Sequence, residues 1–279
     1  MRASARTPLL AAAACSAAFV TLLAFAYVLG PAERIDAIAL HGLATLRGPW
    51  ADPLAHLFTH LADPLPLLVM LAAVLASGFA LGRRRQALAA VALVGGANVT
   101  AQVLKVVLAH PRVQPALGID QLGPEAFPSG HATASMSIAL AAVLVAPARW
   151  RATVAAAAAV YVVAVCTSVL VLAWHFPSDV LGGLLVAAAF FFCAVAAVRS
   201  IPGPDRVRAR SGMGLAAPPK LGEAALVLLA GLAVFALLRA EDLLAFARLH
   251  TVATATALAI AAASAGLLAS AALITDDRL

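Results

Sequence analysis

Eight long apolar segments, separated by shorter polar stretches, constrain the fold of this chain more than any other feature. Each is close to the roughly 20 residues that a helix needs to cross a bilayer. A segment in lipid must satisfy its backbone hydrogen bonds internally, and the alternation typical of a membrane barrel is absent. The segments therefore predict spanning helices, at about 8–30, 65–82, 86–109, 131–147, 152–174, 178–198, 222–238 and 251–274.

The composition indicates a membrane protein, and after the predicted spans are removed no stretch of sequence remains that would form a soluble domain. Of 279 residues, 63% are hydrophobic and 11% are charged, whereas about a quarter of the residues in globular proteins are charged. We therefore predict an all-α, polytopic transmembrane helical bundle. It consists of a six-span core at 1–200, a basic and proline-rich cytoplasmic linker at 201–221, and a C-terminal appendage of two spans at 222–279.

The lysines and arginines predict the orientation of the bundle. With the N-terminus in the cytoplasm, thirteen of the nineteen lie inside, as the positive-inside rule requires. The net charge of +6 is then a topology signal, and nucleic-acid binding is not expected. The first segment is predicted to be an uncleaved signal anchor rather than a signal peptide, because its apolar run continues past Cys15 to Gly30. Arginine in place of lysine and the high alanine content favour a bacterial inner membrane.

Three polar motifs fall at the ends of the apolar segments, and the predicted topology places all three on the external face. Such an apolar chain has little structural reason to put charged and imidazole side chains there. One miscounted span would have moved a motif to the opposite side. The motifs contain Lys105 with Arg112, then Ser129, Gly130 and His131, and then His175 with Asp179.

The first two motifs provide the parts of a phosphate-binding site. Lys105 and Arg112 are cations, and the guanidinium group of arginine matches the geometry of phosphate oxygens. Ser129 and Gly130 stand just before a predicted helix, where a hydroxyl and backbone N–H groups meet the positive end of the helix dipole.

The histidines add groups that can carry out a reaction. Near neutral pH one imidazole can attack phosphorus while the other protonates the leaving oxygen. Asp179 is expected to accept a hydrogen bond from one ring nitrogen of His175, which leaves the other nitrogen as a nucleophile.

In combination these motifs resemble the type 2 phosphatidic acid phosphatase superfamily, integral-membrane lipid phosphatases that share a core fold with vanadium haloperoxidases. The resemblance covers about residues 60–200. It rests on Lys105-x6-Arg112, on Pro128-Ser129-Gly130-His131 and on Ser168-x6-His175-x3-Asp179. It implies His175 as the nucleophile that forms a phosphohistidine, Asp179 as its orienting partner, and His131 as the general acid. The implied phosphate-binding residues are Lys105, Arg112, Ser129 and Gly130, and no metal or other cofactor is implied.

Two positions depart from the family pattern. Val113 stands where the family usually has proline, which affects mainly the stiffness of the loop. Val169 stands where the third motif usually has arginine, so one phosphate-binding cation is missing. Removing a charged donor from a transition-state oxygen costs on the order of 10²–10³ in rate. Three cations are candidates to replace it, namely His110, Arg34 and Arg47.

We therefore expect a membrane-bound hydrolase that acts on a lipid phosphate or diphosphate monoester at the outer membrane face. Polyprenyl diphosphate, phosphatidic acid, phosphatidylglycerophosphate and lipid A phosphates all fit these residues. Two alternatives stay open because of Val169, a catalytically impaired protein that binds lipid phosphate and a phosphotransferase between lipids. The appendage at 222–279 shows no chemistry of its own, and packing against the core or homo-oligomer formation is expected of it.

Overall fold

The computed structural model describes residues 5–111, 122–201 and 239–275. Within these residues every regular element is an α-helix, which confirms the prediction of an all-α chain. The helices in chain order are α1 (Arg6–Val28), α2 (Gly30–Ala44), α3 (Ala51–His60), α4 (Pro64–Ala80), α5 (Arg84–Val107), α6 (Gly130–Val145), α7 (Ala148–Val171), α8 (Pro177–Ser200), α10 (Ala240–Leu249) and α11 (Thr251–Ile274).

Seven of the eight predicted spans coincide with one of these helices, and the eighth, 222–238, lies outside the described residues. Among the described residues, five helices are long and apolar enough to cross a membrane, namely α1, α5, α7, α8 and α11. A sixth crossing is formed if α3 and α4, which meet at a bend of 54°, count as one span. These findings agree with the predicted polytopic bundle.

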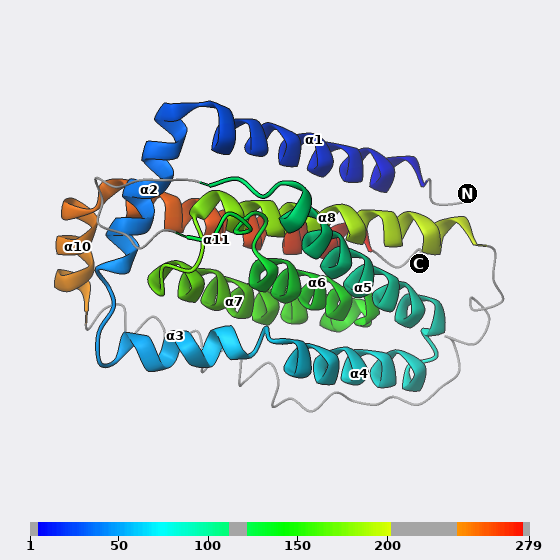
Figure 1. Cartoon of the computed structure of the whole chain (residues 1–279). Helices are drawn as coiled ribbons and strands as arrows, with labels where there is room; N and C mark the ends of the chain where they lie inside the picture. Colours follow the sequence, from blue (N-terminus) through cyan, green and yellow to red (C-terminus); the bar gives the residue numbers. More distant parts are fainter. Residues whose placement is uncertain (1–4, 112–121, 202–238, 276–279) are drawn as a thin grey trace.

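Helix α6 is shorter than the three helices that surround it, α5, α7 and α8, each of which has 24 residues. Its 16 residues rise about 24 Å at the α-helical repeat, less than the roughly 30 Å thickness of a bilayer's hydrocarbon core. In Figure 1, the start of α6 and the end of α7 point toward the end of the bundle where α10 lies, and α6 starts further inside the bundle than α7 ends. The N-terminus of α6 is therefore recessed from that end of the bundle.

Three segments that lie between the predicted spans, where we predicted no helix, are helices in the structure. They are α2, α3 and α10, which follow or precede the predicted spans. Each is too short or too polar to cross a bilayer, so a search for long apolar runs does not find it. Local signals are present nonetheless, since α2 has Pro31 and Glu33 in its first turn, where proline and acidic residues favour a helix start.

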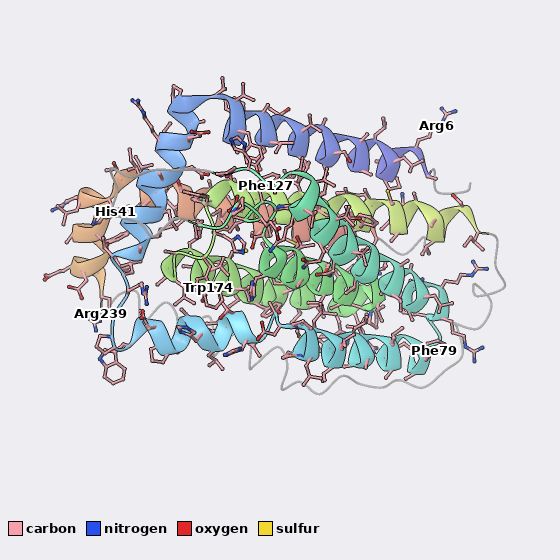
Figure 2. The ribbon with its side chains drawn as sticks, viewed as in Figure 1. Arg6, His41, Phe79, Phe127, Trp174 and Arg239 are labelled. Carbon is pink, nitrogen blue, oxygen red and sulfur yellow. The ribbon has the colours of Figure 1, made fainter. Side chains whose placement is uncertain are left out.

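The long helices lie side by side along one axis (Figure 1), with α6 enclosed by α5, α7 and α8. Helix α1 packs along α8, and the α3–α4 pair lies on the opposite side, where α3 contacts α7 and α4 contacts α5. Figure 2 places Arg6 and Phe79 at one end of the bundle and His41 and Arg239 at the other. The first pair therefore marks the end predicted to be cytoplasmic, and the second pair marks the end predicted to be external.

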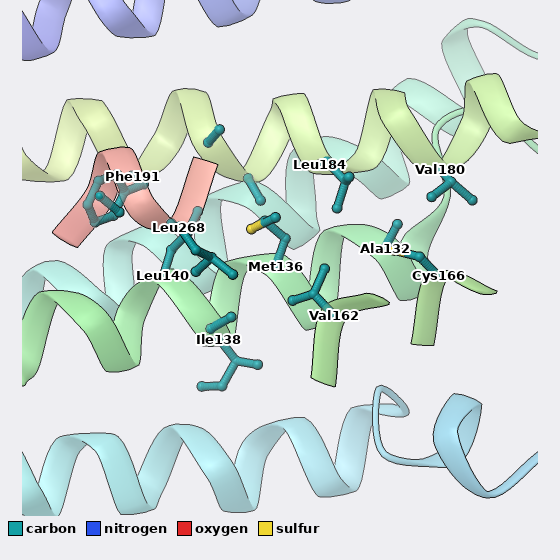
Figure 3. Close-up of a cluster of buried hydrophobic side chains, with 14 of the residues drawn as sticks. Ala132, Met136, Ile138, Leu140, Val162, Cys166, Val180, Leu184, Phe191 and Leu268 are labelled. Atoms are coloured by element: carbon teal, nitrogen blue, oxygen red, sulfur yellow. The ribbon is translucent and has the colours of Figure 1, made fainter. Parts of the chain in front are cut away.

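The core is built around α6, almost every side chain of which is buried. Met136 lies among Val162 of α7 and Leu184 of α8 (Figure 3). Helix α11 contributes Ile260 and Leu268 to the same cluster and packs mainly against α7 and α2. The described part of the C-terminal region is therefore packed on the core, and the division into core, linker and appendage stays a prediction.

Candidate active site

Backbone hydrogen bonds join the second and third motifs. Ser129 caps the N-terminus of α6, where its hydroxyl accepts from the N–H of Ala132 at 3.4 Å. The backbone N–H of Ser129 donates to the carbonyl of Asp179 on α8 at 2.9 Å. The Thr133 hydroxyl also donates to the Ser129 carbonyl at 2.9 Å. The start of α6 is thus fixed against the first turn of α8.

Two glycines on α8 make this close approach possible. A Cβ placed on Gly183 would lie 2.6 Å from the Ser129 carbonyl oxygen and 2.9 Å from the Thr133 hydroxyl. A Cβ on Gly182 would lie 2.8 Å from the ring of Phe127, the residue joined to Pro128 by a cis peptide bond. Contacts this short are sterically forbidden, so α6 and α8 meet through glycine.

The turn between α7 and α8 carries His175. Ala173 adopts a left-handed conformation with φ of 57°. Its N–H donates to the Leu170 carbonyl, and the Trp174 N–H donates to the Val169 carbonyl. This is the hydrogen-bond pattern of a Schellman cap, which usually places glycine at the left-handed position. The cap ends α7 and directs the chain toward His175, which is 7% exposed.

Asp179 lies in the first turn of α8 and is fully buried. Its Oδ2 accepts a hydrogen bond of 2.8 Å from the backbone N–H of Phe176, which satisfies a donor at the helix start. The same oxygen lies 3.6 Å from Nδ1 of His175. At that distance the two groups can form an ion pair but no hydrogen bond, so the hydrogen bond that the sequence led us to expect between them is not seen.

The ammonium group of Lys105 lies against the start of α6. A Cβ placed on Gly130 would lie 3.7 Å from Lys105 Nζ and 3.6 Å from Nε2 of Gln102. Lys105 belongs to the last turn of α5, so two helices bring a cation and backbone N–H groups to one place. A phosphate bound there would meet the lysine, the Ser129 and Gly130 region and the positive end of the α6 dipole.

His131 is the second residue of α6 and faces His175, with the two ring centroids 6.5 Å apart. Its ring also lies 5.6 Å from the indole of Trp174, which Figure 2 shows beside α7. On another side, Nε2 of His131 lies 3.5 Å from Oδ1 of Asp63. His131 is therefore placed between the proposed nucleophile and a carboxylate.

Asp63 occupies the turn between α3 and α4 and contacts two histidines. Its Oδ2 lies 2.7 Å from Nδ1 of His60, and its Oδ1 faces His131. The hydrogen bond from His60, together with the electrostatic attraction between Asp63 and the protonated form of His131, holds the pKa of the Asp63 carboxyl below its ordinary value. Asp63 is therefore an anion at neutral pH.

Asp36 of α2 holds the N-terminus of α8 from a third direction. Its two carboxylate oxygens accept hydrogen bonds from the backbone N–H of Ser178 at 3.0 Å and from the Ser178 hydroxyl at 2.5 Å. Ser178 directly precedes Asp179. This buried carboxylate therefore fixes the helix turn that carries part of the third motif.

The structure brings together six of the seven predicted site residues, which are Lys105, Ser129, Gly130, His131, His175 and Asp179. The seventh, Arg112, lies outside the described residues. Sequence reasoning missed Asp36 and Asp63. The one local signal was that each is an acidic residue near the predicted external end of an apolar segment. Their partners in the site, Ser178 for Asp36 and His131 for Asp63, are distant in sequence.

Val169 is fully buried in the apolar core cluster. Of the cations proposed to replace the missing arginine, Arg47 pairs with Asp52 at 3.1 Å on an exposed surface. The ring of His110 packs 4.8 Å from Tyr27, and Arg34 is exposed on α2. None of these three side chains is placed toward Val169 by a contact among the described residues. In this part of the chain, the cation that we find at the start of α6 is Lys105.

Metal-binding groups of side chains are not seen in the described parts of the chain, where no three His, Cys, Asp or Glu residues lie close enough to hold an ion. The site consists instead of a lysine, a helix start, two histidines and two carboxylates. Such a set can bind an oxyanion, form a covalent bond through an imidazole and transfer a proton.

Comparisons with known proteins agree with the motifs. Residues 86–201 match the model of the PAP2 superfamily, and this range contains all seven predicted site residues. The chain also resembles a solved structure described as the first transmembrane PAP2 type phosphatidylglycerolphosphate phosphatase from Bacillus subtilis. The match has a TM-score of 0.56 at 22% sequence identity and covers 71% of this chain and 99% of that chain. No curated protein sequence matches this one.

Proposed function

We propose that this chain, whose resemblance to the PAP2 superfamily is confirmed over residues 86–201, is a membrane-bound phosphatase. Its substrate would be a lipid phosphate or diphosphate monoester, and the reaction would pass through a phosphohistidine. The observation that carries the proposal is the meeting of His131, His175 and Lys105 where α5, α6 and α8 come together. Neither histidine motif can act alone, and backbone hydrogen bonds hold the two together.

In the first step, Nε2 of His175 attacks phosphorus, because Nδ1 faces the carboxylate of Asp179. The bond from phosphorus to the lipid oxygen breaks, and that oxygen takes a proton from His131. Asp179 stabilises the positive charge that develops on the His175 ring, in the role that a carboxylate plays beside a histidine base. The product of this step is a dephosphorylated lipid and a phosphohistidine.

In the second step, water attacks the phosphohistidine, and His131, now neutral, takes a proton from the water. The bond between phosphorus and nitrogen breaks, and inorganic phosphate leaves. His131 thus ends the cycle with the proton that it lost, so no outside acid is needed. Lys105 and the N–H groups at the start of α6 stabilise the negative charge on the phosphate oxygens in both steps.

The recessed start of α6 supports a substrate that arrives from the membrane. The proposed phosphate site, at the start of α6, lies beside spanning helices and further into the bundle than the end of α7 (Figure 1). A lipid whose headgroup enters there keeps its hydrocarbon chain in the apolar surroundings. Polyprenyl diphosphate, phosphatidic acid, phosphatidylglycerophosphate and lipid A phosphates all meet this description. The proposal places the protein in a bacterial inner membrane with the site facing the exterior.

The test is phosphate release from a panel of these lipids by the purified full chain in detergent micelles. We expect His175→Ala to abolish release and to prevent trapping of labelled phosphate on the protein. His41→Ala is the matched control, because His41 is an exposed histidine on α2. Release that is unchanged in His175→Ala would refute the phosphohistidine mechanism.

A second candidate function is favoured by Val169, which supplies an apolar side chain where the family has a cation. A chain with a weakened phosphate site would bind lipid phosphate without turning it over. Binding of the lipid panel without phosphate release would select this function. Transfer of the label from His175 to an added acceptor alcohol, with no transfer to water, would select the phosphotransferase instead.

A further inference from the structure

A carboxylate outside the region that matches the family model contacts the proposed general acid. Asp63 lies in the turn between α3 and α4, whereas the match begins at residue 86. Its Oδ1 is 3.5 Å from Nε2 of His131. The α3–α4 bend of 54° turns the chain at this point, so the path of two helices places this carboxylate beside the site.

The surroundings of His131 otherwise disfavour a positive charge on its ring. His131 is largely buried, with its side chain 25% exposed. Lys105 lies against the preceding residue, Gly130, and the ring of His175 faces His131 from the α7–α8 turn. The third neighbour is the indole of Trp174, which carries no charge. A neighbouring cation and desolvation both favour the neutral imidazole.

A neutral imidazole cannot serve as the acid of the first step. Because the lipid oxygen must take its proton from His131, the ring has to be protonated before the substrate reacts. An anion close to the ring favours that state. Asp63 is such an anion, and its second oxygen is held by His60, which is mostly exposed.

We propose that Asp63 is a counter-ion that favours the protonated form of His131 in the resting site, and that it is therefore a positioning residue for the general acid. The inference rests on the proposed function for its catalytic meaning. The ion pair itself does not depend on turnover. Asp63 acts through His131 and makes no contact with the substrate in this scheme.

The experiment measures the titration of His131 by NMR in the full chain, labelled at histidine and held in detergent micelles without substrate. The His131 signal is assigned by its loss in His131→Ala. In Asp63→Asn, we expect the titration midpoint of His131 to fall by about half a unit to one unit, because the partner charge is lost from a partly exposed pair. Asp63→Glu, which restores the carboxylate, should recover most of this shift.

Asp52→Asn is the matched control, since Asp52 lies on the same helix pair but bonds to Arg47 and Gly48. It should leave the His131 midpoint unchanged. A second measurement follows kcat/KM against pH with dioleoyl phosphatidic acid in micelles, where the alkaline decline should move to lower pH in Asp63→Asn.

A His131 midpoint that is the same in Asp63→Asn and in the unchanged protein would overturn the inference, whether or not the protein hydrolyses lipid phosphates. A lowered midpoint in a protein that releases no phosphate would leave the counter-ion role intact and refute the proposed function instead. The substrate-free titration thus separates the two failures.

Discussion

Ser129 and Asp179 are joined by a backbone hydrogen bond of 2.9 Å from the N–H of one to the carbonyl of the other. One residue caps α6 two positions before His131, and the other faces His175 from α8. The bond therefore fixes the relative position of the two histidines through the main chain. Substitutions near this bond should change the spacing of the histidines, and the first predictions concern them.

Gly183→Ala should destabilise the contact between α6 and α8. Its new Cβ would stand 2.6 Å from the Ser129 carbonyl oxygen, so the two helices must separate. Overpacking of this kind costs about 1–3 kcal/mol, and phosphate release should fall with it. Thermal unfolding in detergent checks the stability. Gly95→Ala is the control, because nothing lies within 4 Å of a Cβ there, and equal effects of the two substitutions would contradict the prediction.

Ala173→Gly should stabilise the protein. Ala173 has φ of 57°, a conformation that is costly for alanine and free of steric cost for glycine. After the loss of chain entropy by glycine is subtracted, we expect a gain of about 0.5–1 kcal/mol in the free energy of unfolding. Ala156→Gly within α7, the helix that this cap ends, should have the opposite sign, because Ala156 is an exposed residue in the helix interior. Two losses of similar size would argue against strain at Ala173.

Asp36→Asn should loosen the first turn of α8. The substitution weakens two buried hydrogen bonds from Ser178. A hydrogen bond to a charged group contributes about 1.5–3 kcal/mol to the free energy of unfolding. We expect a loss of about 2 kcal/mol in stability, with a lower kcat because Asp179 follows Ser178. Glu33→Gln, one turn earlier on α2, is the comparison. A variant as stable as Glu33→Gln would show that the Asp36 contact contributes little.

Lys105→Met should weaken phosphate binding while preserving the fold. Lys105 brings its ammonium group to the start of α6, and loss of one such donor typically lowers the rate by about 10²–10³. Steady-state kinetics with phosphatidic acid measure the change in kcat/KM. Arg84→Met removes a cation from the opposite end of α5 and should have little effect. Comparable losses of kcat/KM in both variants would mean that the charge of Lys105 does not act on the phosphate.

Much of the fold followed from hydrophobicity alone. A spanning helix needs a long apolar run, and runs such as 86–109 and 178–198 end within a few residues of α5 and α8. Helices α2, α3 and α10 were missed because their residues mix apolar and charged side chains over too short a length. What places such helices is packing against their neighbours, which the pattern of one segment does not contain.

The site divides in the same way. Motif spacing identified the histidines and Asp179, because residues at fixed offsets along a helix or turn share one position in space. The two additional carboxylates were out of reach, since Asp36 and Ser178 are separated by 142 positions. The partner of His131 likewise comes from a turn whose position depends on the bend between α3 and α4. Contacts of this kind depend on topology rather than on local sequence.

The packing of α11 beside α8 has a practical consequence. The guanidinium group of Arg199 donates to the carbonyl of Ile274, so the last turns of these two helices meet. The start of α1, marked by Arg6 in Figure 2, lies at the same end of the bundle. An affinity tag on either terminus would then anchor every copy by one face. In a supported bilayer prepared in this way, every copy would have the same orientation. His131 and His175 would then face the compartment opposite the tag, where the solution can be exchanged.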